Sequence, residues 1–418
     1  MNTSSMTVTI TRLGHQGDGI ADGPIFVPRA LPGEVVEGVV EGGRMASPRI
    51  LSPVAERVRP PCRHAKTCGG CTLQHAEDGF LALWKVGVVE TALKAQGVEA
   101  PILAISTSPA QSRRRVTLAA RRLKHGAQVG FHGLKSGTII EMSECHLIRP
   151  ELLAMLQLIR DMTALGASRK GRLAVTLTVL DEGVDIAVAG GKPLEPGLFA
   201  RLAEMVSGAG VIRLTWSGEP VARFGPTYLT LGPAQVPMPP GAFLQATTEG
   251  EAALVAAVAQ ALDGARNVAD LFSGVGTFAL PLSKNASITA VESEGEMLDA
   301  LLSGWRGAEG LKSVRIERRD LFRRPLLPDE LAKFDGVVLD PPRAGAEAQI
   351  AELARAPVPV LAMVSCNPVS FARDAKILCD AGFTIEWLRV VDQFRWSPHI
   401  ELVARFTRKG FKLPQFQL

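Results

Sequence analysis

Three cysteines lie close together early in the chain, in the stretch PCRHAKTCGGCTLQH at residues 61–75. Cys62, Cys68 and Cys71 have the spacing Cys-x5-Cys-x2-Cys, and the glycines between the last two let the backbone wrap closely around a bound group. Six cysteines in 418 residues are too few for a disulfide scaffold. Clustered thiols in a reducing compartment are more often a metal or catalytic site, so we expect such a site here rather than disulfides.

A glycine-rich turn follows an apolar strand in NVADLFSGVGTFALPL, residues 267–282. The strand runs past Asp270, and the chain continues through Gly274 and Gly276 into a predicted helix, where glycines allow a ligand to approach the backbone. Glu292 closes the next apolar strand, SITAVE, at the separation of about 20 residues where a carboxylate binds ribose hydroxyls. The pattern predicts an adenosine-containing cofactor, and both NAD and S-adenosylmethionine fit it.

The next candidate group is Asp340, which ends the apolar strand FDGVVLD and is followed by Pro-Pro-Arg. The two prolines impose a rigid, extended turn beside the cofactor. This Asp-Pro-Pro turn resembles the strand-four motif of class I methyltransferases, which dehydrogenases do not usually carry. The third turn glycine expected for a pyrophosphate is replaced by Ala279. Both features favour S-adenosylmethionine.

A possible nucleophile stands at the end of the strand VPVLAMVSC. Cys366 is followed by Asn367, Pro368 and a predicted helix, so its thiol should feel the positive end of the helix and ionise readily. The alternative is a buried core cysteine, for which Cys379, inside that helix, serves as the example.

A thiolate beside a methyl donor suits methylation of uracil at carbon 5. Carbon 5 is a poor nucleophile, but addition of a thiolate to carbon 6 converts the ring into an enolate that can accept the methyl group. The methylated adduct must then lose its carbon 5 proton to a nearby base. Glu401, at the start of the last strand in HIELVARF, is the candidate base, and a surface charge is the alternative for it.

These residues require a scaffold of several domains, since 418 residues exceed one core. Residues 1–56 carry short alternating runs between Gly and Pro turns and predict a small closed β structure. Residues 80–97 are spaced as a helix, and 113–235 read as an α+β domain. Helices and strands alternate over 249–408, which predicts a doubly wound parallel sheet.

Hydropathy predicts a cytosolic chain, and local charge points to phosphate contacts. No apolar run is long enough to span a bilayer, and the N-terminus lacks the order of a secretion signal. The net charge is only +4, yet SRRRVTLAARRLK (residues 112–124) and RFTRKGFK (residues 405–412) concentrate basic side chains. Two such runs favour phosphate contacts over a merely solvated face. We expect a cytoplasmic monomer without membrane contact.

Together the motifs resemble the RNA uracil-5-methyltransferase family over the whole chain. DLFSGVGTFALPL is similar to its cofactor motif, DPPRAG to its fourth-strand motif, SCNPVSFARD to its nucleophile motif and HIELVA to its base motif. The resemblance implies an N-terminal TRAM-like, RNA-binding β-barrel at 1–56, a central α+β iron–sulfur domain at 57–240 and a class I, Rossmann-like catalytic domain at 241–418. The helix near 80–97 is expected to pack on the catalytic domain.

The resemblance also implies roles for individual residues. Cys366 matches the nucleophile and Glu401 the base. The positions expected to bind S-adenosylmethionine are Gln245, Phe272, Gly274, Gly276, Thr277, Glu292, Asp320 and Asp340. Gln245 would also lie beside the target base. Thr277 and Asp320 both depart from the asparagine that is common in the family at their positions.

For the cysteine run, the resemblance implies a 4Fe–4S cluster with Cys145, in MSECHLI, as the fourth ligand. Zinc is the competitor, because His64, His75 and His146 are available, but zinc sites favour paired short spacings. Four thiolates suit iron–sulfur better. Methyl transfer moves no electron, so we expect a structural cluster.

The expected reaction is methylation of a uridine in structured RNA, with 23S ribosomal RNA preferred because members acting on transfer RNA often lack the cluster and the barrel. The alternative within the class is transfer RNA uridine methylation. A cytosine methyltransferase would need an acid for ring nitrogen 3, and none is paired with Cys366. The alternatives of other classes are an iron–sulfur NAD-dependent oxidoreductase and a zinc-containing RNA-binding protein with an inactive catalytic domain.

Overall fold

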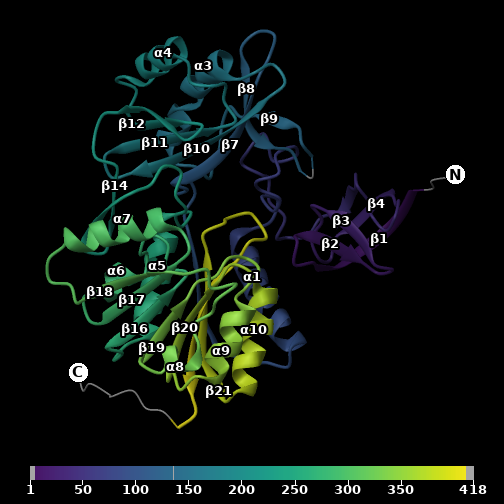
Figure 1. The fold of residues 1–418 in the computed structure, drawn as a ribbon. Coiled ribbons are helices and arrows are strands. Elements are labelled where there is room, and N and C mark those ends of the chain that lie inside the picture. The colour runs from purple at the N-terminus through teal and green to yellow at the C-terminus, as the bar shows by residue number, and fades with distance from the viewer. Residues whose placement is uncertain (1–4, 135, 411–418) are drawn as a thin grey trace.

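The computed structural model describes residues 5–134 and 136–410, which form three large sheets and one hairpin (Figure 1). The N-terminal sheet is antiparallel, in the order β3-β2-β1-β4-β5. Its strands are β1 (Ser5–Leu13), β2 (Asp18–Ala21), β3 (Ile25–Pro28), β4 (Val35–Val39) and β5 (Arg49–Ser52). Alternating Ile10, Val27 and Val36 side chains fill its small core. The described part of residues 1–56 therefore contains a five-stranded sheet, and its closure into a barrel stays a prediction.

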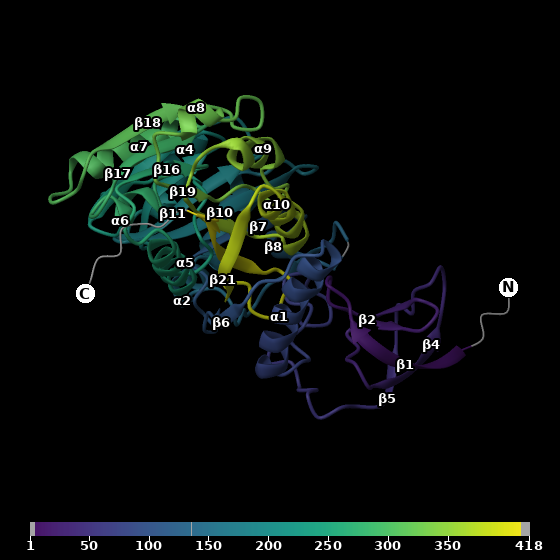
Figure 2. The same cartoon turned by 90° about the horizontal axis from the view of Figure 1, so that it is seen from below.

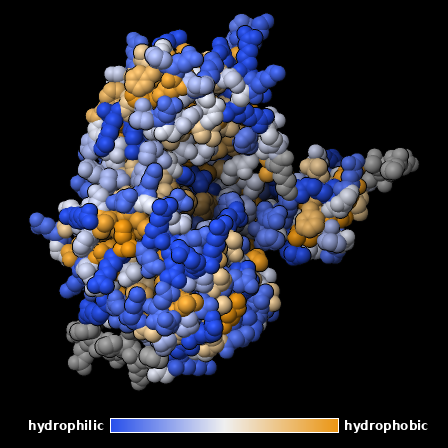
Figure 3. Space-filling model, viewed as in Figure 1, coloured by the Kyte–Doolittle hydropathy of each residue, from blue (hydrophilic) through white to orange (hydrophobic). Residues whose placement is uncertain are grey.

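The N-terminal sheet forms a lobe of its own, in purple, beside the rest of the molecule (Figure 1). It joins the body through a separate apolar cluster in which Leu13 and Leu31 pack with Leu73 and Trp396. Leu73, from the cysteine-rich segment, also donates its backbone N–H to the Trp396 carbonyl at 3.0 Å. That segment therefore lies where the lobe meets the body. In the space-filling view the lobe projects to one side of a larger, hollowed mass (Figure 3).

The middle sheet has the order β13-β12-β11-β10-β7-β8-β9. Its strands are β7 (Arg115–Arg122), β8 (Ala127–His132), β9 (Ile139–Glu141), β10 (Arg172–Leu180), β11 (Gly183–Ala189), β12 (Val211–Trp216) and β13 (Glu219–Arg223). The helices α2 (Pro150–Ala154), α3 (Leu156–Gly166) and α4 (Pro196–Val206) accompany it. Apolar side chains of α3 and α4 pack on the sheet around the fully buried Trp216. The predicted α+β character of this region is confirmed.

The third sheet has the order β18-β17-β16-β19-β20-β22-β21-β6. Its strands are β6 (Ile102–Thr107), β16 (Asn267–Leu271), β17 (Ser287–Glu292), β18 (Val314–Arg318), β19 (Gly336–Leu339), β20 (Val360–Ser365), β21 (Phe383–Asp392) and β22 (Glu401–Arg408). Strands β16 to β20 are parallel, as the alternation of helix and strand predicted. β22 runs antiparallel to both β20 and β21, so the expectation of a wholly parallel sheet is wrong there. A short loop joins β21 to β22 and reverses the chain, whereas a parallel pair needs a longer crossover.

Helices cover both faces of this sheet (Figures 1 and 2). One face carries α5 (Thr248–Ala261), α6 (Ala279–Leu282), α7 (Gly295–Arg306) and the hairpin β14 (Tyr228–Leu231) and β15 (Ala234–Pro237). The other carries α1 (Asp78–Ala95), α8 (Pro328–Leu331), α9 (Glu347–Arg355) and α10 (Pro368–Asp380). Two apolar cores result, one on each side. This is the layered, Rossmann-like arrangement that the sequence predicted.

The eight-stranded sheet also takes elements from far upstream in the sequence. Helix α1 packs against α10, and β6 pairs in parallel with β21 at the sheet edge. The chain therefore leaves this sheet after β6, builds the middle sheet and returns at α5. Among the described residues, no helix is long and apolar enough to cross a membrane.

Candidate active site

One cavity lies beyond the carboxyl ends of β16, β17, β19 and β20, the edge where doubly wound sheets bind ligands. Nearly all the predicted catalytic and cofactor residues line it, namely Gln245, Phe272, Gly274, Thr277, Glu292, Asp320, Asp340, Cys366 and Glu401. Gly276 is the exception, since it packs against Leu280 and Leu301, where a Cβ would approach their side chains to 3.0 Å or less. Glycine is needed at this position because the turn packs closely against these two leucines.

The turn after β16 presents backbone to the cavity. Phe272 has a φ of 64°, an uncommon conformation for a residue with a side chain, and Gly274 follows with a φ of 53°. A Cβ at Gly274 would meet nothing within 4 Å, so this glycine leaves space open beside the cavity. The Glu292 carboxylate accepts from the backbone N–H groups of Gly274 at 3.1 Å and Ser293 at 2.6 Å, which fixes it at the end of β17. A group that needs backbone contact on one side and a carboxylate on the other fits this cradle.

Two aromatic rings border the same part of the cavity. The rings of Phe272 and Phe322 lie 5.4 Å apart between centroids and are tilted by 57°. Asp320 accepts from the Phe322 backbone N–H at 3.0 Å, and this bond holds the exposed Phe322 loop in place. Phe322 also lines the cavity, but no periodicity or spacing in the sequence marked it as a site residue.

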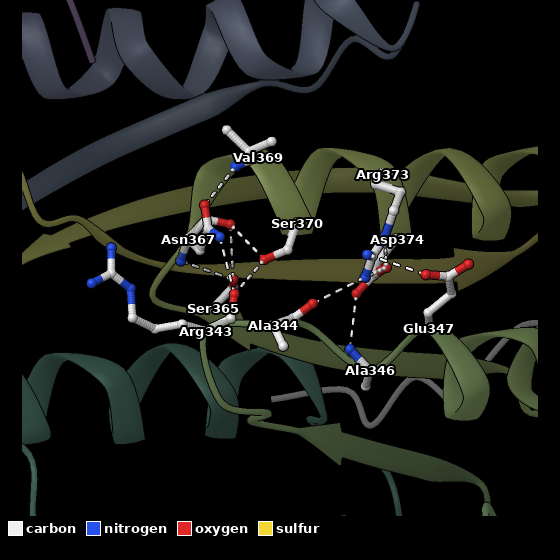
Figure 4. A network of polar contacts seen from close by, with 10 residues as sticks. All are labelled: Arg343, Ala344, Ala346, Glu347, Ser365, Asn367, Val369, Ser370, Arg373 and Asp374. Carbon is white, nitrogen blue, oxygen red and sulfur yellow. Dashed lines mark hydrogen bonds and ion pairs between the residues drawn. The ribbon is translucent and has the colours of Figure 1, made fainter. Parts of the chain in front are cut away.

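The loop after β19 and the loop after β20 are interlocked by hydrogen bonds (Figure 4). The Arg343 carbonyl accepts from Asn367 Nδ2 at 3.0 Å and from Ser370 Oγ at 3.2 Å. Asn367 is also the N-cap of α10, since its Oδ1 accepts from the Val369 N–H at 3.1 Å. Pro368 occupies the first helical position, which suits its fixed φ. The Asp-Pro-Pro motif and the cysteine motif are therefore one rigid unit.

An ion pair between the buried Asp374 and the partly exposed Arg373 completes this unit (Figure 4). Asp374, with no exposed surface, pairs with Arg373 and accepts from the Ala346 N–H at 3.1 Å. Gly345 has a φ of 81°, and a Cβ there would lie 2.6 Å from Asp374 Oδ2. The glycine of DPPRAG is thus required by a left-handed backbone and by the close approach of α10.

The prediction that Cys366 ionises readily is wrong for the protein without substrate. Burial raises the pKa of the Cys366 thiol to about 11, and the charges of Glu401 and Asp340 act in the same direction. Arg343 lowers the pKa, but by less. Asn367 is the N-cap of α10, so Cys366 lies outside the helix. The charges that raise the pKa of its thiol are those of Glu401 and Asp340. The thiol is therefore protonated at neutral pH.

The two carboxyl groups beside the thiol are also perturbed. Burial raises the pKa of Glu401, which is 6% exposed, to about 8, and the Asp340 charge adds to this effect. Burial raises the pKa of Asp340 to about 7. Glu401 is therefore not the surface charge that was its alternative. Carboxyl groups with pKa values near neutrality can both accept and release protons under physiological conditions.

A residue that the sequence analysis missed lies behind this site. Gln393 is 4% exposed, and its Nε2 donates to Gln245 Oε1 at 2.6 Å. A lone polar residue in a loop carries no spacing signal, so only the fold reveals it. Arg343, at the cavity wall, was quoted within a motif but given no role.

The four cysteines of the predicted metal site line a different cavity, together with His64, Arg113 and His146. Backbone N–H groups of His64 and Gly70 each point at a sulfur, Cys62 Sγ and Cys68 Sγ, at 3.4 Å. Burial, with smaller contributions from Cys145, Cys68 and Cys62, raises the pKa of Cys71 to about 12. Among the described residues, no set of three or more His, Cys, Asp or Glu side chains is drawn together as metal ligands.

Two arginines of the first basic run differ from the expected phosphate-binding face. Arg114 is 3% exposed, forms an ion pair with Glu251 of α5 and donates its Nε to the Gln245 carbonyl at 3.2 Å. Arg115 donates to the Ala242 carbonyl at 2.9 Å. These arginines join the middle sheet to the catalytic loop and are not free for RNA.

In the second basic run, Arg408 donates to the carbonyls of Leu353, Ala354 and Ala356, at 2.7 to 3.2 Å, and so has an internal role. Lys412 lies outside the described residues.

Comparison with known proteins places this geometry in a family. The family model for tRNA (Uracil-5-)-methyltransferase matches residues 305–409. An uncharacterized RNA methyltransferase of Brucella suis is 43% identical over 97% of this chain and 99% of its own. The 23S rRNA (uracil(1939)-C(5))-methyltransferase RlmD of Chromohalobacter salexigens is 32% identical over 96% of this chain and 89% of its own.

A solved structure shares the fold over nearly the whole length. The Pyrococcus abyssi tRNA (uracil-54, C5)-methyltransferase, in complex with S-adenosyl-L-homocysteine, superposes with a TM-score of 0.76 at 22% identity, covering 96% of this chain and 99% of that one. The full-length match to a relative above 30% identity decides the family, and the oxidoreductase alternative is wrong. The chain belongs to the family of S-adenosylmethionine-dependent RNA uracil-5-methyltransferases.

Proposed function

We propose that this enzyme methylates carbon 5 of a uridine in 23S ribosomal RNA through a covalent bond between Cys366 and carbon 6 of the uracil. The observation that carries the proposal is the convergence of Cys366, Glu401 and Asp340 on one cavity with the glycine turn of β16. S-adenosylmethionine, when bound, supplies an electrophilic methyl group. Gly274, Glu292 and Asp320 are the residues that would hold it.

The raised pKa values assign the proton transfers. As the Cys366 sulfur bonds to carbon 6, the thiol proton passes to Asp340, whose pKa of about 7 suits acceptance near neutral pH, while Glu401 is ionised. After carbon 5 has gained its methyl group, Glu401 removes the carbon 5 proton, and the ring electrons expel the sulfur as a thiolate. Asp340 returns its proton to this thiolate, and Glu401, whose pKa is about 8, releases the carbon 5 proton to solvent.

Incubation with RNA containing 5-fluorouridine and S-adenosylmethionine tests this mechanism. Fluorine at carbon 5 cannot leave as a proton, so the wild-type enzyme should form a stable cross-link detectable by denaturing electrophoresis. Cys366→Ala should form none. Cys379→Ala is the matched control, since this thiol lies on α10 outside the cavity. A cross-link that persists in Cys366→Ala would refute the covalent mechanism.

Ribosomal RNA is favoured as the substrate because the Chromohalobacter relative that covers most of the chain is named for it. Transfer RNA is the second candidate, since the matching family model and the superposed Pyrococcus enzyme are named for that substrate. Nucleoside mass spectrometry on separated RNA pools from a deletion strain distinguishes them. Loss of 5-methyluridine from transfer RNA alone would overturn our choice.

We also propose that the cysteine cavity holds a structural 4Fe–4S cluster on Cys62, Cys68, Cys71 and Cys145. Four thiols share one cavity, and backbone N–H groups point at two of the sulfurs, as around iron–sulfur clusters. His64 is a poor zinc ligand here, since its Nε2 lies 3.1 Å from Ser143 Oγ. Anaerobic purification should give a brown protein whose visible absorbance bleaches with dithionite, whereas a colourless zinc protein would refute the proposal.

The three sheets then have separate roles. We propose that residues 1–56 form a TRAM-like RNA-binding unit, that 57–240 hold the cluster, and that 241–418, completed by α1 and β6, carry out catalysis. The N-terminal lobe stands beside the rest of the molecule (Figure 1), and we propose that a folded RNA contacts both the lobe and the site. RNA affinity should fall with salt if phosphates are held.

A further inference from the structure

The side chain of Gln393 lies in the short loop after β21, where it connects the base-recognition side of the site to the catalytic carboxylate. It is buried behind the cavity wall and is not among the cavity-lining residues. Its two polar ends have different partners, since Oε1 lies 2.7 Å from the Ala246 N–H and Nε2 lies 2.6 Å from Gln245 Oε1. Gln393 therefore touches residues of the site without touching a ligand.

The backbone determines the orientation of both amides. A peptide N–H can only donate, so the end of Gln393 that faces Ala246 must be its oxygen. The other end, its NH₂, must donate, and the atom of Gln245 that receives this bond must be an oxygen. A flipped assignment of either amide would set two donors or two acceptors against each other. The Ala246 N–H group thus determines, through Gln393, which end of the Gln245 amide faces Gln393.

The Gln245 amide nitrogen is the end of the side chain that is left to interact with a ligand in the cavity. Among the described residues no hydrogen bond from Gln245 Nε2 is found, and this atom is not among the fully buried, unpartnered ones, so it is accessible. The backbone of Gln245 is held as well, because its carbonyl accepts from Arg114 Nε at 3.2 Å. Gln245 therefore offers a fixed N–H donor to the cavity that Cys366 also lines.

Packing holds Gln393 in this arrangement. A Cβ on Gly250, in the first turn of α5, would lie 2.7 Å from Gln393 Cβ. Only glycine at this position lets the loop after β21 approach the helix so closely. Gln393 also forms a hydrogen bond with Glu401 that favours the ionised carboxylate. One buried side chain thus orients both the amide and the base.

We infer that Gln393 is a positioning residue that locks the Gln245 NH₂ toward the target base, so that the site selects a pyrimidine with a carbonyl at carbon 4. Uracil has an acceptor there, whereas cytosine has an amino donor. When Cys366 adds to carbon 6, negative charge develops on this same oxygen, and the fixed donor stabilises it. The inference rests on the proposed covalent mechanism.

The test uses the full-length enzyme, 23S rRNA transcribed with 5-fluorouridine or with 5-fluorocytidine, and S-adenosylmethionine. Gln393→Met removes the donor while keeping length and burial. We expect the rate of cross-link formation with 5-fluorouridine RNA to fall about 10-fold to 100-fold, since loss of an oxyanion donor costs about 100-fold or more. The preference for 5-fluorouridine over 5-fluorocytidine should shrink about 10-fold. Rates within a factor of about two of wild type would overturn the inference.

A second variant separates positioning from general destabilisation. Gln245→Met should slow the reaction by at least as much as Gln393→Met, and the double variant should be no slower than Gln245→Met alone, because one residue acts through the other. A double variant whose rate loss equals the product of the two single-variant losses would overturn the inference. Gln349→Met is the control, since Gln349 is also fully buried and bonds the backbone of Leu326 at 2.8 and 3.1 Å, away from the cavity.

The control variant should lose stability without losing the preference for 5-fluorouridine. Loss of that preference in Gln349→Met would show that destabilisation alone produces it, and would overturn the inference. A wild-type enzyme that forms no cross-link would instead refute the proposed function itself.

Discussion

The catalytic cavity and the cysteine cavity both bury thiols, but they surround them with different neighbours. Burial raises the pKa of Cys366 to about 11 and that of Cys71 to about 12, so neither is a thiolate by itself at neutral pH. Cys366 faces two carboxyl groups that can take its proton, whereas Cys71 faces other thiols. A buried thiol beside a base can act as a nucleophile, whereas buried thiols beside one another stay protonated unless a cation stabilises their thiolates.

The largest effect expected from this difference is on Cys366 itself. Cys366→Ala removes the atom that activates the ring, so methyl transfer measured with radiolabelled S-adenosylmethionine should fall by about 10⁴-fold or more. Cys379→Ala should stay within about twofold of wild type. Turnover by Cys366→Ala at the wild-type rate would remove the distinction between the two cavities.

Loss of the base should trap the reaction rather than prevent it. Glu401→Gln cannot remove the carbon 5 proton, so a methylated covalent complex should accumulate on ordinary uridine RNA while product formation falls about 10²-fold to 10⁴-fold. In the wild type, the ionised base is needed, so product formation should rise with pH through the Glu401 pKa of about 8. A Glu401→Gln enzyme that releases product at the wild-type rate would contradict this role.

The same carboxyl group should affect stability with the opposite sign. The Glu401 pKa is raised in the folded state, so its contribution to stability is fully present below the ordinary value of 4.5 and is lost as pH rises through about 8. Thermal unfolding followed between those pH values should show a decrease for the wild type that is smaller for Glu401→Gln. An equal decrease of the melting temperature with pH in both proteins would mean that the Glu401 carboxylate is not buried.

In the cysteine cavity, a single substitution should act on stability before activity. Cys71→Ser should remove the visible absorbance and lower the melting temperature, while the cross-link rate with 5-fluorouridine RNA stays within about 10-fold of wild type. Loss of the cross-link in a folded Cys71→Ser protein would show that the two cavities are chemically coupled.

The smallest effect is expected on the free energy of unfolding, when a residue next to one of these thiols is replaced. Asn367→Ala removes the N-cap of α10 and one bond to the Arg343 carbonyl, which should cost about 1–2 kcal/mol in unfolding free energy. Arg63, beside the cysteine cavity, forms an exposed ion pair with Glu144, so Arg63→Ala should change stability by about 1 kcal/mol or less. A larger loss for Arg63→Ala in chemical denaturation would reverse this ranking.

The sequence predicted what local pattern encodes. The strand ends marked by Asp340 and Cys366 meet at one cavity, because parallel strands bring their carboxyl ends together. It could not predict the place of β6 in the sheet, since β6 pairs with β21 far along the chain. It also missed the antiparallel β22, because the pattern of helices and strands does not show that the chain reverses after β21. The prediction that Cys366 ionises readily was wrong because a sequence shows that a helix follows the cysteine. It does not show that the thiol is buried beside carboxyl groups.

Strand β6 has a consequence for how the molecule is made. Its pairing partner β21 lies on the other side of the entire middle sheet in the chain, so on the ribosome β6 emerges long before anything can cover its edge. The middle region can collapse first, while the eight-stranded sheet closes only after the last strands are translated. A fragment starting at residue 241 would lack this border strand, leave β21 open to other chains and tend to aggregate.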